Sequence, residues 1–248
     1  MNSYSEPLNN EEWSAHYNLD SLNLVVNSVL SGNVSVWSDE LLKLSSEKEK
    51  ILEIGCGSGA SSLWLAKHNR IVTALDYTES SVALVNTAIK RIDTEGYISC
   101  NTIVADATEE LPFEDNEFDM AFQSGLLEHF STDEQINLLK NWRRVCKRMV
   151  SMIPNAASIP YRVGKQILED QGSWKYGLEI PKHSLIKEFI EAGIQVEKEY
   201  TIGTEWAISF LPPRHYLRKT FKKMQDQGID LDKMMQGYLL VTIGKCEN

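Results

Sequence analysis

The sequence predicts a single α/β domain built around a mostly parallel sheet. From about residue 50 onward, short runs rich in β-branched residues alternate with segments whose apolar residues recur at helical spacing. A glycine-rich turn follows the first of these runs directly, and two further strand-like segments lie toward the end of the chain. Because strands that alternate with helices form right-handed βαβ units, we expect helices on both faces of the sheet.

The predicted strands share a short apolar core bounded by polar or turn residues. Five of them belong to the alternating region, and the last two, coming after five βα units, suggest an antiparallel edge. They are ILEI (51–54), IVTAL (71–75), TIVA (102–105), FDMAFQ (118–123), RMVSMI (148–153), QVEKEYTI (195–202) and GYLLVTIG (237–244).

The predicted helices begin at residues that can cap a helix. The first follows the glycine turn over 60–67, and Thr78 can cap a second one that ends before Gly96. Ser131 and Glu134 have the spacing of a capping box ahead of a third helix. A fourth helix is expected over 185–192, with Ser184 as its cap and Gly193 as its end. On the second helix, the face expected to pack carries Val82, Val85, Ile89 and Ile92.

We expect one domain over residues 1–248, with two additions to the sheet. Residues 1–49 precede the first strand and are expected to form a helical cap over the ligand edge. The connection over 155–182 is long, and connections of that length are usually lids or binding loops. The domain therefore divides into a cap (1–49), a half that carries the glycine turn (50–154) and a half that carries the lid (155–248).

Composition indicates an ordinary globular protein that avoids anionic partners. Apolar residues make up 42% of the 248 residues, and the formal net charge is −10. Phosphate backbones and anionic lipid surfaces are poor generic partners for such a chain. The first residues are polar and acidic, and no apolar run approaches the roughly 20 residues of a membrane helix. The cysteines, which form no CxxC pair, are expected to be reduced thiols of a cytoplasmic protein, without zinc; they are Cys56, Cys100, Cys146 and Cys246.

The glycine turn is the strongest functional signal. It comprises Glu53, Gly55, Cys56 and Gly57 and continues to Gly59, directly between a strand and a helix. Glycines allow a tight turn and a close approach of the backbone to a ligand, and the following helix directs its first amides toward that ligand. The same residues also fit the dinucleotide pattern GxGxx(G/A), so a nicotinamide or flavin enzyme is one alternative.

Two acidic residues follow the next two strands. Asp76 ends the second strand, where a carboxylate can accept both ribose hydroxyls, but dinucleotide enzymes use the same position. Asp106 ends the third strand, where its carboxylate can accept the amino group of an adenine while the Ala107 amide lies near the ring. Asp106 therefore favours an adenosine cofactor other than a dinucleotide.

At these residues the chain resembles the class I S-adenosylmethionine-dependent methyltransferases. The resemblance rests on ILEIGCGSG, LDYT and VADATEELPFEDNEFDMAFQSGLLEHF and covers roughly residues 50–155. It implies a Rossmann-like, seven-stranded sheet and S-adenosylmethionine as the cofactor. It implies little about the acceptor of the methyl group.

The resemblance also assigns roles to particular residues. Gly55 and Gly57 would pass near the amino acid part of the cofactor, Asp76 would hold the ribose, and Asp106 and Ala107 the adenine. Tyr77 would pack on the adenine, and Gln123 would lie at the methionine end beside the sulfonium. Many relatives carry an aromatic pair that closes over the cofactor, and Trp13 and Tyr17, four residues apart on one face of a helix, suit that role.

Candidates for the acceptor side are fewer. His129, in LLEHF, lies at the carboxyl edge of the fourth strand and is the first candidate base, with Glu179 a weaker one. Trp174, Tyr176 and His183 are expected to contact the acceptor, because aromatic faces pack on flat or apolar molecules and attract cations. A basic cluster is either an anion site or a solvated helix face; it comprises Arg214, Arg218, Lys219, Lys222 and Lys223.

These observations favour methyl transfer to an O or N atom of a small molecule. The sequence has no NPPY-type segment, no cysteine motif suited to base C5 chemistry and no cluster of metal-binding acids. Three alternatives stay open at this point: a methyltransferase that acts on protein or RNA, a dinucleotide-dependent oxidoreductase, and a non-catalytic relative that binds the cofactor as a partner subunit.

Overall fold

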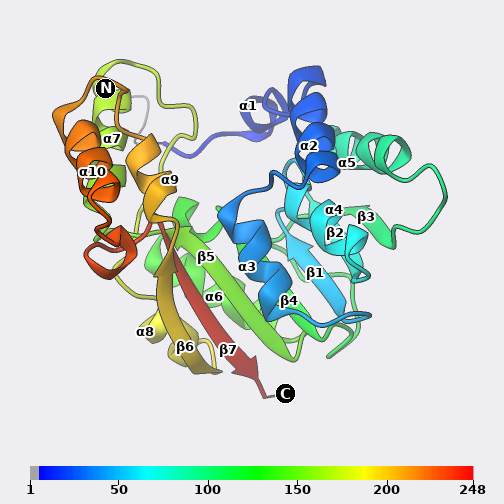
Figure 1. Cartoon of the computed structure of the whole chain (residues 1–248). Coiled ribbons are helices and arrows are strands. Elements are labelled where there is room, and N and C mark those ends of the chain that lie inside the picture. Colours follow the sequence, from blue (N-terminus) through cyan, green and yellow to red (C-terminus); the bar gives the residue numbers. More distant parts are fainter. Residues whose placement is uncertain (1–5, 248) are drawn as a thin grey trace.

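The computed structural model describes residues 6–247 and has the α/β fold that the sequence predicts. One seven-stranded sheet has the order β3-β2-β1-β4-β5-β7-β6 (Figure 1). The strands are β1 (Lys50–Ile54), β2 (Ile71–Asp76), β3 (Cys100–Val104), β4 (Met120–Ser124), β5 (Arg148–Pro154), β6 (Ile194–Ile202) and β7 (Leu239–Cys246). Strands β1 to β5 pair in parallel, whereas β7 runs antiparallel to both β5 and β6 and so forms the antiparallel edge with β6 outermost.

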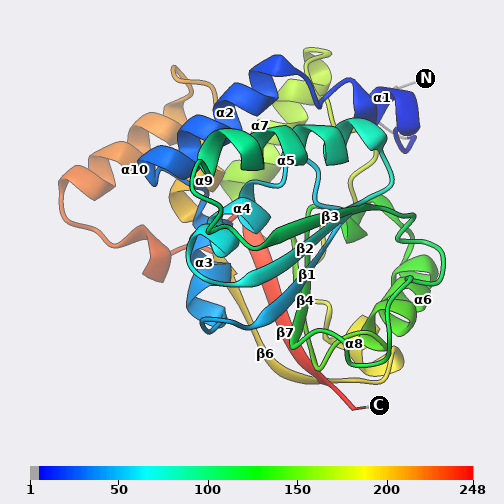
Figure 2. The same ribbon diagram turned by 90° about the vertical axis from the view of Figure 1, so that its right-hand side faces the viewer.

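Helices cover both faces of the sheet. Figure 2 shows α3 and α4 on one side and α6 and α8 on the other. The helices are α1 (Asn10–Ser14), α2 (Leu19–Ser31), α3 (Val36–Leu44), α4 (Ala60–Lys67), α5 (Glu79–Ile92), α6 (Thr132–Arg143), α7 (Ile159–Asp170), α8 (Ile186–Glu191), α9 (Thr204–Ser209) and α10 (Tyr216–Asp226), with short 3-10 turns η2 (Leu127–His129) and η3 (Leu231–Lys233).

The core follows from this layering. On the α6 and α8 face, Trp142 and Phe189 are fully buried against residues of β1, β4 and β5. On the opposite face, Leu41 of α3 and Leu65 of α4 pack against the sheet, and α2 continues this layer over α4 and α5. Because both faces are covered, the central strands are apolar along nearly their whole length.

Most helix ends lie where capping chemistry predicts them. Thr78 caps α5 by accepting a bond from the Ser81 amide, and Ser131 forms the expected capping box with Glu134 ahead of α6. Helix α8 begins one residue later than predicted, at Ile186, although Ser184 Oγ does accept a hydrogen bond from the Ile186 amide at 3.2 Å.

Two packing details differ from the sequence prediction. The fully buried face of α5 is formed by Ser81, Leu84, Val85 and Ala88, while Ile89 and Ile92 of the predicted stripe pack half-buried against the same core, so the packed face is centred slightly off the predicted one. The connection over 155–182 contains the helix α7, which we did not predict, and this helix turns the first part of the expected lid into a packed element.

The glycine turn tolerates no side chain at its third glycine. Gly59 has φ +69°, and a Cβ there would lie 2.4 Å from Val85 Cγ2 on α5. We expect Gly59→Ala to lower the free energy of unfolding by about 3 kcal/mol, from the left-handed backbone and the overpacking combined. Gly96→Ala is the matched control, because Gly96 has φ +80° with no atom within 4 Å and should lose only about 1 kcal/mol. Equal losses in urea denaturation would contradict the role of the α5 contact.

Candidate functional site

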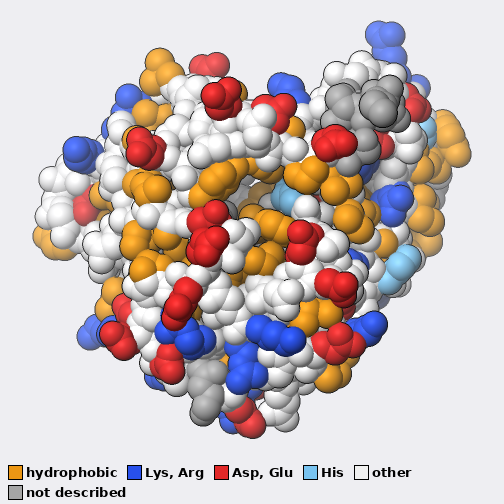
Figure 3. All heavy atoms as spheres, turned by 180° about the vertical axis from the view of Figure 1, so that it is seen from behind, with side chains coloured by type: hydrophobic (Ala, Val, Ile, Leu, Met, Phe, Trp, Pro, Cys, Tyr) orange, Lys and Arg blue, Asp and Glu red, His pale blue; other side chains and the backbone are white. Residues whose placement is uncertain are grey.

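A cavity of about 770 Å³ lies at the carboxyl ends of β1 and β4. The N-terminal cap and helix α2 close one side, and the segment after α7 closes the other. In Figure 3 hydrophobic side chains gather around a hollow in the surface, and acidic side chains lie at its rim. Among the described residues, not one lysine or arginine lines this cavity. It is therefore a site for a ligand that needs no cationic partner.

The glycine turn forms the floor of the cavity. Gly55 and Gly57 have φ of +70° and +52°, and both line the cavity together with Glu53 and Cys56. The Cys56 amide donates to Leu75 O at 2.8 Å, which ties the turn to β2. A Cβ on Gly57 would lie 3.2 Å from the Tyr17 hydroxyl, so glycine at this position leaves room for the Tyr17 side chain beside the turn.

The Glu53 carboxyl is buried at the end of β1. Its Oε2 accepts bonds from the Ser62 amide at 3.1 Å and from the Ser62 hydroxyl, in the first turn of α4. Burial and, to a lesser degree, the nearby Asp76 raise the pKa of Glu53 to about 8, against the opposing effect of the Ser62 bonds. Glu53 therefore enters the site as a largely uncharged acid at neutral pH.

Asp76 is bound to the turn itself. Its Oδ2 accepts from the Gly57 amide at 2.8 Å, and its Oδ1 accepts from the Thr78 amide at 2.9 Å and the Thr78 hydroxyl at 2.8 Å. The side chain is 4% exposed and does not line the cavity wall. Asp76 therefore shapes the turn, and one lone pair of its carboxylate stays without a hydrogen bond.

The residues expected at the adenine lie outside the cavity. Asp106 is exposed and accepts two hydrogen bonds from Thr108, and Ala107 O accepts from Trp142 Nε1 at 2.8 Å. Tyr77 is 38% exposed beside Asp76 and Asp106. Partial burial is the main cause that raises the pKa of Tyr77, and the two carboxylates raise it further. These three residues, which we call the open shelf, follow the ends of β2 and β3 outside the cavity, with Asp106 and Tyr77 exposed near one another.

Trp13 and Tyr17 both line the cavity, but one prediction about them is wrong. Helix α1 ends at Ser14, so the two rings do not share a face of one helix. Asn18 starts a new helix there by accepting bonds from the Asp20 and Ser21 amides, and this leaves Tyr17 in the turn between the helices. The Tyr17 ring is half-buried over the glycine turn, where loss of solvent and, to a lesser degree, Asp76 raise its pKa.

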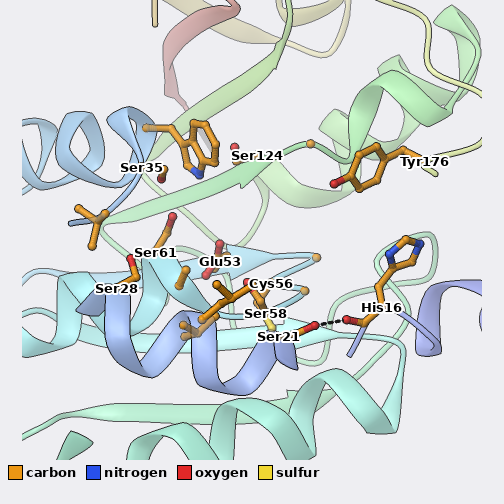
Figure 4. Close-up of a pocket in the computed structure, with 18 of the residues that line it drawn as sticks. His16, Ser21, Ser28, Ser35, Glu53, Cys56, Ser58, Ser61, Ser124 and Tyr176 are labelled. Carbon is orange, nitrogen blue, oxygen red and sulfur yellow. Dashed lines mark hydrogen bonds between the residues drawn. The ribbon is translucent and has the colours of Figure 1, made fainter. Parts of the chain in front are cut away.

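The cap and the edge of the sheet also bring to the cavity residues to which the sequence analysis gave no role. Figure 4 shows the serines and His16 directed around the cavity, with the Ser21 hydroxyl bound to the His16 carbonyl. The serines that line the cavity are Ser21, Ser28, Ser35, Ser58, Ser61 and Ser124. Serines carry no periodic signal of their own, so only the fold brings them together.

The Gln123 side chain does not reach the cavity. It is fully buried, its Oε1 accepts from the Leu126 and Leu127 amides at 2.9 and 3.2 Å, and its Nε2 donates to Ser151. It positions the turn after β4, and the residues that line the cavity at this point are Ser124 and Gly125.

The three residues expected at the acceptor lie in different places. Tyr176 lines the cavity, stacks on His16 with ring centroids 5.7 Å apart, and directs its hydroxyl toward the middle of the cavity (Figure 4). Trp174 is buried behind it, donates from Nε1 to Gly177 O at 3.0 Å and does not line the cavity. His183 is exposed and outside the cavity, because it follows the lid on the chain but precedes α8 at the surface.

His129 lines the cavity with a defined tautomer. Its Nδ1 lies 2.5 Å from Leu178 O, which can only accept, so Nδ1 carries the proton in the neutral ring. Burial lowers the pKa of His129, against the opposing effect of the Leu178 and Gly125 carbonyls, and its ring packs edge-on against Trp13. At neutral pH the His129 ring is therefore uncharged, with its Nδ1 proton held by the Leu178 carbonyl.

Two carboxyls, the buried Glu128 and the half-buried Glu179, complete the cavity wall near His129. Glu128 is 3% exposed, its Oε2 has no hydrogen-bond partner, and burial raises its pKa to about 8. Glu179 accepts a bond from the Tyr161 hydroxyl, and burial and then Glu128 raise its pKa well above the usual value. Tyr238 lies beside them. Glu128 and Tyr238 were missed from the sequence, where Glu128 was visible only as the acid of the LLEH segment.

The burial of Glu128 has a consequence for stability. A carboxyl whose pKa is about 8 in the folded chain and 4.5 otherwise stabilises the fold fully below pH 4.5, and this contribution is lost as pH rises through 8. We expect Glu128→Gln, which never ionises, to gain stability relative to the parent between pH 5 and 8, on the order of a few kcal/mol. Thermal melts across this range test it, and a difference in Tm that does not change with pH would contradict it.

The described residues offer no alternative metal centre. No group of three or more His, Cys, Asp or Glu side chains within 6–247 is arranged to hold a metal ion. In the same range, every helix is too short or too polar to cross a membrane. The basic cluster lies on and just before α10, which has no buried residue, and no member of the cluster lines the cavity.

Comparison with known proteins agrees with this geometry. Residues 51–149 match the profile of a family described as a methyltransferase domain. No curated protein matches the chain in sequence.

Solved structures share the fold over most of the chain. A Haloferax volcanii methyltransferase, solved in complex with the Trm112 methyltransferase activator, is 16% identical, with 97% of this chain and 100% of that chain covered and a TM-score of 0.65. A Pyrococcus horikoshii protein is 17% identical, with 88% and 91% covered and a TM-score of 0.60. Geranyl diphosphate C-methyltransferase from Streptomyces coelicolor, solved with S-adenosylhomocysteine, is 12% identical, with 85% and 78% covered and a TM-score of 0.57.

Proposed function

We propose that this chain, a class I S-adenosylmethionine-dependent methyltransferase, transfers the methyl group to an O or N atom of a small molecule. The observation that carries the proposal is the cavity of about 770 Å³ beside the glycine turn, enclosed by the cap and the segment after α7. Cavities of roughly 300–1,000 Å³ bury most of the surface of a small ligand.

The glycine turn fits the cofactor. Gly57 puts no side chain between the turn and Tyr17, and Asp76 beside it has lone-pair capacity left for ribose hydroxyls. We place the amino acid part of the cofactor at Gly55 and Gly57 and the ribose at Asp76. Asp106, Ala107 and Tyr77 would hold the adenine on the open shelf.

The other residues that we assign to the cofactor line the cavity or hold its lining in place. Trp13 and Tyr17 would close over the cofactor, while Glu53 and Cys56 hold the turn in place. Gln123 would position Ser124 and Gly125 beside the reacting end through its bonds to the Leu126 and Leu127 amides. The division into a cap (1–49), a cofactor-binding half (50–154) and an acceptor-side half (155–248) of one domain describes these roles.

The chemistry asks little of the protein beyond alignment. S-adenosylmethionine supplies a methyl group that is already activated on sulfur. The cap and Tyr176 exclude water and hold the acceptor in line, and such positioning supplies on the order of 7–11 kcal/mol in favourable cases. A base on the cavity wall that takes the proton an acceptor loses typically adds 10²–10⁴-fold, and the uncharged His129 ring is one candidate beside the neighbouring carboxyls.

The charges of the cavity favour a small acceptor without phosphate groups. The Streptomyces neighbour acts on a diphosphate, but no lysine or arginine among the described residues lines the cavity of this chain. The acidic rim and the net charge of −10 disfavour RNA as well. The Haloferax neighbour was solved with a protein activator, so action on a macromolecule together with a partner subunit is the second candidate.

A methyl transfer assay distinguishes the two candidates. The purified chain is incubated with radiolabelled S-adenosylmethionine and, separately, with small amines, alcohols and acids, with total RNA, and with a protein lysate. We expect label in small-molecule products without any added partner. Label that enters only RNA or protein would overturn the proposal in favour of the second candidate.

A further inference from the structure

Resting on that function, we propose that Glu128 and Glu179 form the acceptor site and select an amine, which Glu128 deprotonates before methyl transfer. Glu128 belongs to η2, directly after β4, and Glu179 belongs to the segment between α7 and α8. Both line the one cavity that contains the glycine turn, together with Ser124 and Gly125.

The backbone holds the two carboxyls on facing segments. The Ile180 amide donates to Glu128 O at 2.8 Å, and the His129 ring binds Leu178 O on the residue before Glu179. These two bonds flank Glu179 in sequence and fix it opposite η2. Backbone hydrogen bonds therefore fix the positions of both residues in the cavity wall.

The pair lacks a cationic partner within the protein. Glu128 Oε2 is buried without a hydrogen bond, and no ion pair involving either carboxyl occurs among the described residues. Lys165, which acts on nearby His129, is ion-paired with Glu169. Oε2 itself is closed off from solvent, so a rotation of the Glu128 side chain must bring it to the cavity that this residue lines. Since buried acids are normally bonded or paired, the lack of a partner within the protein points to one supplied by the ligand.

An ammonium group is the partner that this wall fits. It offers up to three donors, carries the charge that two ionised carboxyls need, and is attracted by aromatic rings. Tyr176 and Trp13 supply such rings on the same cavity. A carboxylate or phosphate group would meet two acids and no lysine or arginine among the described lining residues.

The proton and electron balance is complete. Bound as an ammonium, the acceptor nitrogen has no lone pair, so one proton passes from nitrogen to the Glu128 carboxylate. The nitrogen lone pair then forms the new N–C bond while the methyl's S–C bond breaks, and that electron pair stays on sulfur, giving S-adenosylhomocysteine. The product leaves as a methylated ammonium, and Glu128 returns its proton to water.

Burial is the main cause that sets the titration of Glu128, and its own backbone amide opposes it. Burial holds the pKa of Glu128 near 8, so the acid and its conjugate base are both accessible near neutral pH. The titratable and charged groups around the pair from neighbouring elements are His129, Tyr161, Tyr176, Tyr238 and Lys165.

The test uses matched acceptors and matched variants. We assay the parent chain and three variants: Glu128→Gln, Glu179→Gln and the control Glu191→Gln, at the last residue of α8. Each is given 2-phenylethylamine, 2-phenylethanol and 3-phenylpropanoate, and then wider panels of amines, alcohols and acids. Thermal shifts are measured in the presence of S-adenosylhomocysteine. We expect amines, and not acids, to stabilise the parent and to be methylated.

The variants separate acceptor chemistry from cofactor binding. Glu128→Gln should lower kcat/KM for amines at least about a hundredfold, while the Kd for S-adenosylhomocysteine changes less than threefold. Glu179→Gln should raise the KM for amines about tenfold or more, and Glu191→Gln should match the parent. Should Glu128→Gln fail to fold, Glu179→Gln decides the question through its KM.

The outcomes distinguish this inference from the proposed function. Methylation of alcohols or acids in preference to amines, or amine turnover that Glu128→Gln leaves within threefold, overturns the amine site while the small-molecule function stands. Label that enters only RNA or protein overturns both. An amine panel that is neither methylated nor bound, beside alcohols or acids that are methylated, also overturns the amine site alone.

Discussion

Asp76→Ala is expected to weaken the binding of S-adenosylhomocysteine by at least tenfold. The variant would lack the charge-assisted hydrogen bonds that we place between the Asp76 carboxylate and the ribose, worth about 1.5–3 kcal/mol each. This carboxylate also accepts bonds from the Gly57 amide and from Thr78, so the turn would lose its anchor to β2. Calorimetry with S-adenosylhomocysteine measures the affinity, and thermal melts of the free protein measure the loss of stability, which we expect to be appreciable.

Asp93→Ala is the matched control for this variant. The Asp93 carboxyl also accepts three backbone bonds, from Gly96, Tyr97 and Ile98 at 2.7–2.9 Å, but it lies after α5 and does not line the cavity. It should lose comparable stability and keep its affinity for S-adenosylhomocysteine. Equal affinities of the two variants would contradict the ribose assignment.

Gly57→Val is expected to abolish measurable cofactor binding. Gly57 has φ +52°, where a β-branched residue is strained, and its Cβ would point to the Tyr17 hydroxyl over the floor of the cavity. The added methyls would occupy the place where we put the amino acid part of the cofactor. We expect the Kd for S-adenosylhomocysteine to rise at least a hundredfold, equivalent to about 2.7 kcal/mol, in calorimetry.

Gly228→Val separates backbone strain from blockage of the site. Gly228 has φ +78° with no atom within 4 Å and lies far along the chain, between α10 and η3. It should lose stability through the same left-handed strain while S-adenosylhomocysteine binds as in the parent. If Gly57→Val binds S-adenosylhomocysteine as well as Gly228→Val does, the cofactor does not contact this turn.

The fold was predictable because its signals are local. Strand β1, the turn and helix α4 follow from an apolar run, glycines and a helical period, and the ends of α4 match the prediction at both residues. The capping box before α6 likewise depends on only two residues, Ser131 and Glu134. Helix α7 was missed because Gly164 lowers helix propensity and the meaning of Pro160, which suits the first turn of a helix, was not recognised, whereas burial against α9 stabilises the helix.

The site was only partly predictable because burial and side-chain direction depend on tertiary packing. Tyr176 and Trp174 are two residues apart, yet one faces the cavity and the other packs behind it. Gln123 has the predicted strand position, but its amide is used to hold the turn after β4. The sequence could not predict that Glu128 Oε2 lacks a hydrogen-bond partner, because this depends on how the surrounding side chains pack.

Competitive calorimetry with S-adenosylhomocysteine and NAD tests the central claim most directly. No lysine or arginine among the described residues lines the cavity, so the pyrophosphate of a dinucleotide would find no cationic partner there. We predict that S-adenosylhomocysteine binds in the micromolar range, at about −8 kcal/mol, and that NAD binds far more weakly. Binding of NAD as tight as that of S-adenosylhomocysteine, or tighter, would contradict the assignment of this chain as a methyltransferase.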